Sequence, residues 1–300
     1  PLANGGEGWA PIGKVGTEFT GVLDGANHSI SGLEINRSSD WHAGLFGVTS
    51  DAEIQNLNLF NVDITGDFIA GALVGSARGF AGQITNIRVT GQVSSDNDRI
   101  GCLVGQHNVS LVNVHAHCTV SGRNYVGGLV GSNEGSVQTS SSAGTVTGTS
   151  NVGGLLGRNL WSIDQSFSRA AVTGLSEVGG LIGLNFSNVN NSYAIGGVTG
   201  IDAQTTSGLV GSNGSAFGGG GGAIQNSYAA GVVNGGDPAR AFVGTSVGDV
   251  AYSNNFFNTD VSGQTSATAS SATGLSIFEM RTIDTFTDAG WDFDASTGIW

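Results

Sequence analysis

The chain has 300 residues, of which 39% are hydrophobic and only 11% charged, and its formal net charge is −13 at pH 7. Ten basic residues on so acidic a chain cannot build the basic patch that nucleic-acid phosphates require, so we expect no nucleic-acid partner. Since no apolar run approaches the roughly 20 residues needed to cross a bilayer, we also expect no membrane insertion. The chain starts at Pro1 without a recognisable signal peptide, and we expect it to be a piece of a larger polypeptide.

Residues 1–40 predict N-terminal capping strands. Between residues 19 and 33, apolar and polar side chains alternate on both sides of Asp24-Gly25, a pair that is typical of turns. We expect two strands around this turn that close one end of the fold, because an uncovered strand edge invites pairing with other chains.

From residue 41 to residue 263 the chain is organised by a five-residue motif of the form Gly-Gly-Leu-Val-Gly. Successive copies lie 26 to 33 residues apart, and they end at Gly47, Gly75, Gly105, Gly131, Gly157, Gly183, Gly211 and Gly244. A nearly constant period of this length is typical of stacked repeats that bury their apolar faces on one another. The residue before the leucine is never larger than Cys, so we expect another wall to approach it closely.

A second set of aligned positions follows each motif. An apolar residue opens this set, and two positions later stand Asn56, Asn86, Asn113, Thr139, Gln165, Asn191, Asn226 and Asn254. Stacked amides at one corner predict hydrogen bonds between neighbouring repeats. Nine positions after the opening residue we predict a strand position formed by Val93, Val120, Val146, Val172, Val198, Val233 and Val261.

These short β-branched segments, separated by turn residues, predict an all-β fold, a parallel β-helix or β-solenoid of about eight coils. We expect it to be right-handed, as other parallel crossovers are. A β-propeller is disfavoured because its blades need about 40 residues each. The stretch 201–223, which contains a run of glycines at 218–222, is predicted to be an insertion and a mobile loop.

Residues 264–300 are predicted to form a C-terminal cap. Ser276 and Glu279 have the spacing of a capping box, in which each residue satisfies a backbone N–H of the other at the start of a helix. We therefore expect a short capping helix over about 277–285.

Four positions after the opening residue, the last four repeats carry the aromatic residues Phe167, Tyr193, Tyr228 and Phe256. One aromatic residue per coil should stack at strand spacing, and alternation along the strand places Tyr193 on the outside. An outward ladder would receive sugar rings on its apolar faces, which makes these four residues candidates for ligand binding. The alternative is plain packing under a loop.

Cys102 and Cys118 both occupy positions at which the neighbouring repeats have small residues, so we expect both to be buried within one coil. A disulfide across a thin core and two unpaired buried thiols both fit this pattern. Neither cysteine has a basic neighbour that would make it a nucleophile.

The sequence predicts neither a metal nor a cofactor. His115 and His117 alternate on one predicted strand, with His107 shortly before them, but no third ligand stands at a fixed spacing. Residues 96–98, Asp-Asn-Asp, lack the nine-residue repeat of calcium-binding β-rolls and predict an ordinary acidic turn. The acidic residues share no column, whereas glycan-cleaving enzymes need clustered carboxylates, so we expect no enzymatic activity.

The repeats resemble the GLUG-motif proteins. The residues that carry this resemblance include the motif copies at 127–131, 153–157 and 179–183 and the Asn-Ser-Tyr segments at 191–193 and 226–228. The resemblance implies repeats within large secreted or surface-anchored bacterial proteins, such as filamentous-haemagglutinin-like adhesins, and regions attached to some surface proteases. It supplies no catalytic residues.

We therefore expect a non-catalytic stalk segment of a secreted or surface-exposed bacterial adhesin that contacts glycans or another host or environmental surface. Two alternatives stand beside this hypothesis. The first is a carbohydrate-active β-helix enzyme, a polysaccharide lyase or hydrolase, and the second is an accessory region of a surface protease. An ice-binding face is disfavoured because no Thr-x-Thr column repeats.

Overall fold

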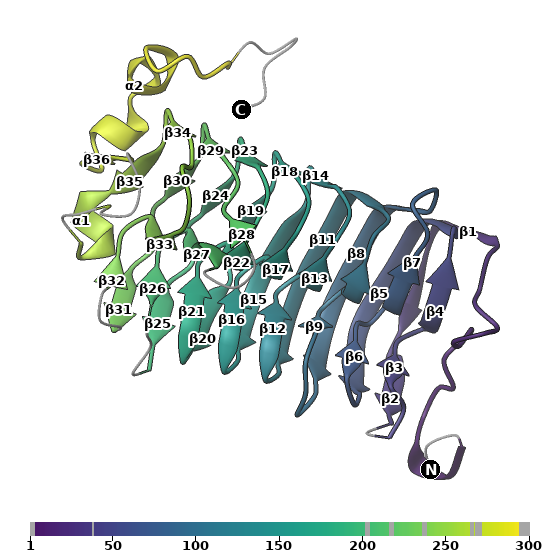
Figure 1. The fold of residues 1–300 in the computed structure, drawn as a ribbon. Coiled ribbons are helices and arrows are strands. Elements are labelled where there is room, and N and C mark those ends of the chain that lie inside the picture. Colours follow the sequence, from purple (N-terminus) through teal and green to yellow (C-terminus); the bar gives the residue numbers. More distant parts are fainter. Residues whose placement is uncertain are drawn as a thin grey trace.

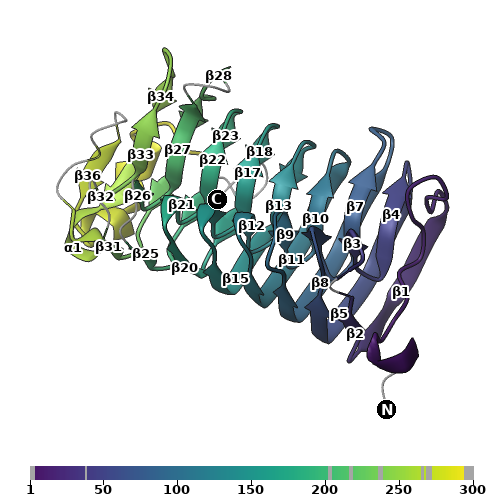
Figure 2. The same cartoon turned by 60° about the horizontal axis from the view of Figure 1, so that its bottom comes forward.

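The computed structural model describes residues 4–37, 39–201, 205–215, 219–235, 239–264, 267 and 272–293. Over these residues the chain winds into an elongated stack of parallel strands, shown in two views (Figures 1 and 2). Each coil contributes strands to three walls, so strands of one wall come from successive repeats. The predicted parallel β-solenoid of about eight coils is confirmed.

Two walls are built from the motif and the residues just before it. The motif wall contains β4 (Phe46–Ser50), β7 (Val74–Arg78), β10 (Val104–His107), β13 (Val130–Asn133), β17 (Leu156–Asn159), β22 (Ile182–Asn185), β27 (Val210–Ser215) and β33 (Val243–Ser246). The short wall contains β3 (His42–Ala43), β6 (Ile69–Ala70), β9 (Ile100–Gly101), β12 (Asn124–Gly127), β16 (Ser150–Gly153), β21 (Ser176–Gly179), β26 (Thr206–Ser207) and β32 (Ala239–Arg240). We number the coils 1 to 8 in the order of the motif-wall strands.

The long wall collects the strands that follow the motifs. In its N-terminal part lie β1 (Val22–Ser31), β2 (Glu34–Asn36), β5 (Glu53–Thr65), β8 (Gln83–Ser94) and β11 (Ser110–Ser121). It continues in shorter strands, β14 (Val137–Gln138), β15 (Ser141–Thr147), β18 (Ile163–Asp164), β19 (Phe167–Ser168), β20 (Ala171–Gly174), β23 (Val189–Asn190), β24 (Tyr193–Ala194), β25 (Val198–Gly200), β29 (Ile224–Gln225), β30 (Tyr228–Ala229), β31 (Val233–Gly235), β34 (Tyr252–Ser253), β35 (Phe256–Asn258) and β36 (Thr273–Leu275).

The motif glycines are required by close approach of the backbone. A Cβ atom added to Gly128 would collide with the carbonyl oxygen of Gly154 in the next coil and would lie 3.0 Å from the Cβ of Ser142 on the facing long wall. A Cβ on Gly131 would lie 2.5 Å from the backbone of Arg99 and Ile100 in the preceding coil. The small column therefore does face another wall, as predicted.

The asparagine column forms the corner at which the long wall bends. All eight of its members have a left-handed backbone, with φ between 47° and 55°. Asparagine adopts this conformation more readily than other non-glycine residues, which explains why it dominates the column. Thr139 and Gln165 occupy the same corner without that advantage.

The N-terminal prediction of two strands around a turn is wrong. Residues 22–31 form one strand, β1, which pairs in parallel with β5 and has a register shift between Asp24 and His28. This register shift is a β-bulge. It contains the predicted turn residues, and Ala26 and Asn27 within it have a positive φ. The preceding segment lies along β4, with Ile12 paired to Phe46. A 3-10 turn, η1 (Asn4–Gly6), begins the described chain.

The predicted insertion at 201–223 is also wrong in its extent. Residues 206–215 belong to the coil, since β26 pairs with β21 and β27 pairs with β22. Only the end of this stretch departs from the repeat, where β28 (Gly219–Gly220) turns back antiparallel onto β27. Residues 202–204 and 216–218, on which the mobile-loop prediction also falls, lie outside the described residues.

The C-terminal end is helical but divided. Val261, predicted in a strand, lies instead in α1 (Thr259–Ser262), which begins where the Asn258 side chain accepts hydrogen bonds from two backbone N–H groups. The predicted helix over 277–285 is split into a 3-10 turn, η2 (Glu279–Arg281), and α2 (Ile283–Thr287). The capping box forms as predicted, because the Ser276 N–H donates to Glu279 Oε2 at 2.7 Å and the Glu279 N–H donates to Ser276 Oγ at 3.3 Å. No helix in the described ranges is long and apolar enough to span a bilayer.

Candidate functional site

The aromatic column forms a stack on the outer face of the long wall. The ring centroids of Phe167 and Tyr193 lie 4.7 Å apart and those of Tyr193 and Tyr228 lie 4.8 Å apart, with interplanar angles of 1° and 4°. The rings repeat at strand spacing because β19, β24 and β30 are paired in register. All three side chains are partly buried.

The face-to-face stacking of these rings limits the ring surface that is available to a ligand. Since the rings lie face to face, neighbouring rings cover each other's faces and only ring edges point away from the wall. The Arg169 guanidinium also lies beside this stack, 5.1 Å from the Phe167 ring centroid. A row of open faces that receives sugar rings, as the sequence suggested, is therefore not what these three residues present.

Phe256, the fourth predicted member, belongs to the core of the cap. Only 7% of its surface is exposed. Its ring packs edge-on against Phe286 of α2, with centroids 5.3 Å apart, and against Trp291 at 5.7 Å. Trp291 is fixed by a hydrogen bond from its indole Nε1 to the carbonyl oxygen of Asn254. The prediction of Phe256 as an exposed ligand-binding residue is wrong.

A groove opens between the aromatic stack and the cap. Its volume is about 540 Å³, within the usual range of small-molecule sites. From the coils it is lined by Ile195, Tyr228 and Ala230, and from the cap mainly by Met280, Arg281, Phe286, Trp291 and Phe293. Burial, followed by the neighbouring Tyr193, raises the pKa of Tyr228, so its phenol keeps its proton.

The asparagine corner carries two runs of side-chain hydrogen bonds, each of which ends on an aspartate. In the first run, Asn113 donates to Asn86 at 2.7 Å, Asn86 to Asn56 at 2.9 Å, and Asn56 to Asp24 at 3.0 Å. In the second, Asn254 donates to Asn226 at 3.2 Å, Asn226 to Asn191 at 3.3 Å, and Asn191 to Asp164 at 2.7 Å. Thr139 and Gln165 separate the two runs. The predicted amide ladder is confirmed within each run.

A second ladder, buried in the core, was missed by sequence reasoning. Asn133 donates to Asn159, Asn159 to Asn185, and Asn185 to Asn213, over 2.6 to 2.7 Å, and all four are fully buried. Asn213 continues the chain to the hydroxyl of Tyr252 at 2.9 Å. The available signal was an Asn two positions after the last motif glycine in four successive repeats.

Buried serines form a third ladder along the long wall. The hydroxyl oxygens of Ser140, Ser166, Ser192 and Ser227 each accept a hydrogen bond from the backbone N–H of the preceding coil. Each hydroxyl in turn donates to the carbonyl oxygen two residues earlier in its own coil. These four serine hydroxyls therefore both accept and donate a hydrogen bond inside the core.

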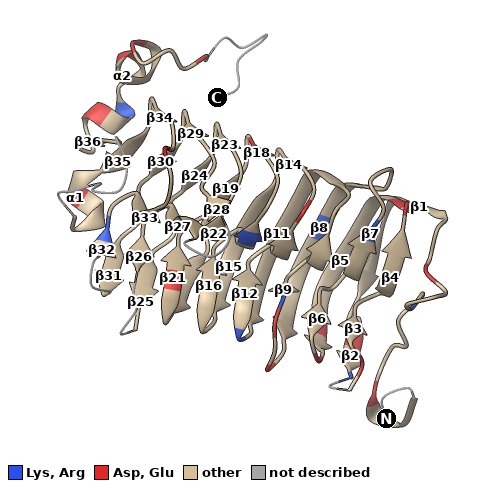
Figure 3. Cartoon of the chain, in the orientation of Figure 1, with Lys and Arg blue, Asp and Glu red and all other residues tan. Residues whose placement is uncertain are grey.

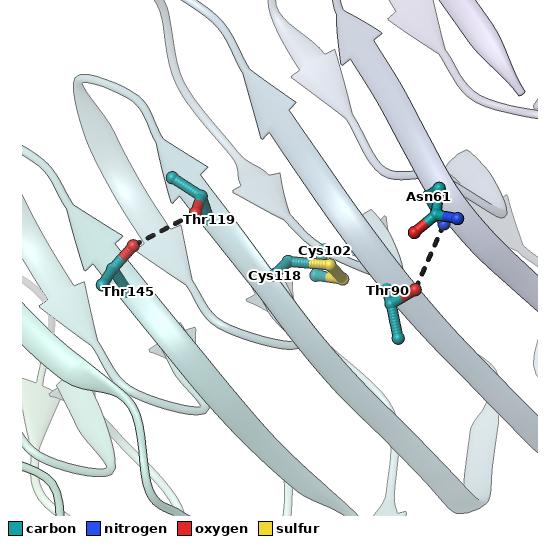
Figure 4. The surroundings of a disulfide bond; sticks show 6 residues. All are labelled: Asn61, Thr90, Cys102, Cys118, Thr119 and Thr145. Carbon is teal, nitrogen blue, oxygen red and sulfur yellow. Dashed lines mark hydrogen bonds between the residues drawn. A yellow bond between two sulfur atoms is a disulfide. The ribbon is translucent and has the colours of Figure 1, made fainter. Parts of the chain in front are cut away.

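The two cysteines are joined as a disulfide inside coil 3, with their Cα atoms 6.0 Å apart (Figure 4). Cys102 precedes the motif leucine, Cys118 lies on β11 of the long wall, and both are buried. Of the two arrangements that the sequence left open, the structure has the disulfide. The bond links two walls across the core of one coil.

The three histidines lie in different environments. His115 and His117 both point outward from β11, and the ring nitrogens of His115 lie within 2.9 Å of Ser141 Oγ and Asn113 Oδ1. Burial and then the charge of Arg88 lower the pKa of His115. His107 instead points into the core, where burial lowers its pKa to about 4. No metal-ligand trio is brought together here.

Two aspartates at and beside the 96–98 turn accept hydrogen bonds from asparagine side chains. In the 96–98 turn, the Asn97 side chain donates to Asp67 at 2.7 Å, and Asp98 accepts from Asn124 at 2.8 Å. Among the described residues, no three His, Cys, Asp or Glu side chains gather as metal ligands. Charged residues are scattered along the coils rather than collected on one wall (Figure 3).

The fold and these ladders define a parallel β-solenoid built from repeats. A family model described as the GLUG motif matches residues 122–147, which correspond to coil 4. The same five-residue motif recurs in the other coils, so the chain contains a series of GLUG-like repeats of which coil 4 matches the family model.

Two relatives share parts of the sequence. Halomucin of Haloquadratum walsbyi is 45% identical over 105 residues, which cover 34% of this chain and 1% of halomucin. A putative Gly-rich membrane protein of Evansella cellulosilytica is 40% identical over 93 residues, which cover 29% of this chain and 10% of that protein. The matched segments thus span only a small part of either relative.

Proposed function

We propose that this chain is a non-catalytic stalk segment of a cell-surface adhesin. The observation that carries this proposal is the continuous in-register stack of coils, which spans roughly 40 Å at about 4.8 Å per coil without a hinge in the described walls. Support comes from the relatives, one named a mucin and one a membrane protein, which are far longer than their matched segments. Neither name describes an enzyme.

The surface location is tested on intact cells that produce the parent protein. Antibodies against this chain should label unpermeabilised cells, and added protease should remove the label. Labelling that requires permeabilisation would contradict the proposal. A cytoplasmic protein labelled in parallel is the control for cell integrity.

We further propose that the groove beside Tyr228 contacts neutral glycans. Aromatic and apolar side chains from the cap face Ile195 and Ala230 of the coils, while Arg281 and Asn258 supply polar groups at its rim. Such a mixture of apolar walls and a few polar groups is typical of sugar-sized sites. Here the ring edges of the stack, rather than ring faces, form part of the wall.

Glycan-array binding by the wild type and two variants tests this site. Ile195→Asp places a charge in the groove at a side chain that is 38% exposed, so it should abolish binding without unfolding the coil. Leu175→Asp, at a side chain that is 42% exposed and outside the groove, is the matched control and should bind as the wild type does. Absence of binding to any glycan would leave the stalk role alone.

A further inference from the structure

A second groove lies at the opposite end of the solenoid. It has a volume of about 570 Å³ and lies between the N-terminal segment 10–15 and residues 37 and 39–42, which precede coil 1. Six coils, or roughly 30 Å at about 4.8 Å per coil, separate it from the groove beside Tyr228 in coil 7. The two grooves share no residue, so each can be tested without disturbing the other.

Trp41 provides this groove with an aromatic ring that has one open face. Its ring stacks on Phe68, with centroids 4.2 Å apart and planes 13° apart, yet 55% of the residue is exposed. Because Phe68 covers one face only, the exposed surface includes the other. This differs from Tyr193, whose ring is stacked between Phe167 and Tyr228. An indole face that is supported from behind is suited to the apolar face of a sugar ring.

Lys14 supplies the groove with a cation that is available to a ligand. It is the only lysine of the chain, and it is exposed. Arg37, which also lines the groove, is already occupied: its guanidinium lies 2.9 Å from Glu7 and 3.3 Å from Asp40, and its Nε donates to the carbonyl oxygen of Trp9. Lys14 makes no comparable ion pair among the described side chains.

Asp40 and His42 also line the groove; the Asp40 carboxylate is paired with Arg37, and His42 does not add positive charge at neutral pH. Burial, followed by the charge of Arg78, lowers the pKa of His42 to about 4, so its imidazole is neutral. The ammonium group of Lys14 is then the one cation of the described lining that is not paired with a carboxylate.

We propose that this N-terminal groove binds a carboxylated sugar residue of an acidic polysaccharide. The sugar ring lies on the open face of Trp41, and its carboxylate accepts hydrogen bonds from the Lys14 ammonium. The net charge of −13 repels a long polyanion as a whole, but this repulsion is screened beyond about 8 Å at physiological ionic strength, whereas a direct ammonium–carboxylate contact is not. Short acidic oligosaccharides are therefore the appropriate probes.

Calorimetric titration of the full chain with a galacturonic acid trimer and with a galactose trimer tests the proposal. The acidic trimer should bind more tightly, Trp41→Ala should weaken its binding at least tenfold, and Lys14→Gln should weaken it about fivefold without affecting the neutral trimer. Trp161→Ala, at a tryptophan that is 53% exposed elsewhere on the surface, is the matched control.

Unchanged binding of the acidic trimer by Trp41→Ala would overturn the site. Equal binding of the two trimers, or an unaffected Lys14→Gln variant, would overturn the choice of a carboxylated sugar. Lys14 is exposed and, among the described side chains, unpaired, so Lys14→Gln should unfold at the wild-type temperature, whereas Trp41→Ala, which loses the stack on Phe68, should remain folded with a slightly lower unfolding temperature. Ile195→Asp should bind the acidic trimer normally, which separates this site from the groove beside Tyr228.

Discussion

Coils 1–3 and coils 4–8 build the same fold from different cores. In coils 1–3 the long wall consists of continuous strands, and β5, β8 and β11 have 13, 12 and 12 residues. One of their inward positions holds Leu57, Ile87 and Val114 in successive coils. In coils 4–7 the same position holds the serines of the buried ladder, and the strands shorten to between two and seven residues. At this position, apolar side chains in coils 1–3 are replaced by hydrogen-bonded serines in coils 4–7.

The same coil geometry is therefore stabilised mainly by apolar burial in one part of the stack and by side-chain hydrogen bonds in the other. In coils 1–3, large apolar side chains fill these inward positions and apolar burial stabilises the stack. In coils 4–7, serine hydroxyls take the same positions, and together with the buried asparagine side chains they form hydrogen bonds between successive coils. Coil 3 is the junction: it carries the disulfide, and its His107 stands in register with Ala77 on one side and Asn133 on the other.

Overpacking the small-residue column in coils 4–7 should lower the unfolding free energy more than any other change proposed here. We expect Gly154→Leu to cost more than about 5 kcal/mol of unfolding free energy and to prevent folding, because the added side chain would collide with the Gly180 carbonyl and Ser168. In coils 1–3, Ala72→Gly removes only a methyl group from the same column and should cost about 1 kcal/mol. Denaturant unfolding followed by circular dichroism measures both losses. A loss below about 2 kcal/mol for Gly154→Leu would contradict the close approach of the Gly180 carbonyl and Ser168.

Truncating side chains of one aligned column should lower the unfolding free energy more in coils 1–3 than in coils 4–7. Leu59, Val89, Ala116 and Ser142 are aligned in coils 1–4. We expect Leu59→Ala to cost about 4 kcal/mol by leaving a cavity, and Ser142→Ala to cost about 1 kcal/mol by removing the 2.6 Å hydrogen bond to the Gly154 carbonyl. Denaturant unfolding measures both losses. A larger loss for Ser142→Ala than for Leu59→Ala would contradict the conclusion that apolar burial contributes more in coil 1 than the serine hydrogen bond does in coil 4.

The disulfide should stabilise the junction by an intermediate amount. Cys102 and Cys118 close a loop with a sequence separation of 16, for which the entropic contribution is about 3 kcal/mol. The double variant Cys102→Ala/Cys118→Ala should lose about this much, and reductant should lower the melting temperature of the wild type only. Mass spectrometry without reductant that finds two free thiols would contradict the assignment.

Acidic pH should destabilise the junction through His107. Its folded-state pKa of about 4 lies below the ordinary value of 6.5, so the unfolded chain binds the proton more tightly. The neutral side chain's contribution to stability is complete above about pH 6.5 and is lost as pH falls toward 4, amounting to about 2 kcal/mol between pH 7.5 and 5. The lowered pKa of His42 adds a further loss of stability as the pH falls over the same range.

The variant His107→Asn isolates this contribution. An asparagine at this position would extend the buried ladder by one residue and cannot be protonated, so the variant should lose less stability between pH 7.5 and pH 5 than the wild type. The measurement is unfolding free energy at both pH values. A pH dependence identical to that of the wild type would show that His107 does not carry the effect.

Most of the repeat could be predicted from the sequence. The small column, the valine positions up to Val233 and the asparagine corner are each visible as recurring residue types, because a residue in a stacked coil meets the same neighbours in every repeat. The candidate site was predicted less well. Phe256 has the spacing of an outward aromatic residue, but the cap that buries it contributes Phe286 and Trp291, which belong to no repeat.

The sequence by itself determined the period, the parallel solenoid and the residues that form its corners, since stacking demands the same side-chain type at the same place in each coil. Only the tertiary structure decided which positions are covered, paired or open. It showed that Cys102 and Cys118 bond across one coil, that ring faces in the aromatic stack cover one another, and that Trp41 stacks on Phe68 while more than half of the residue stays exposed. These contacts join side chains of facing walls or of the two chain ends, and the repeat pattern does not specify such pairs.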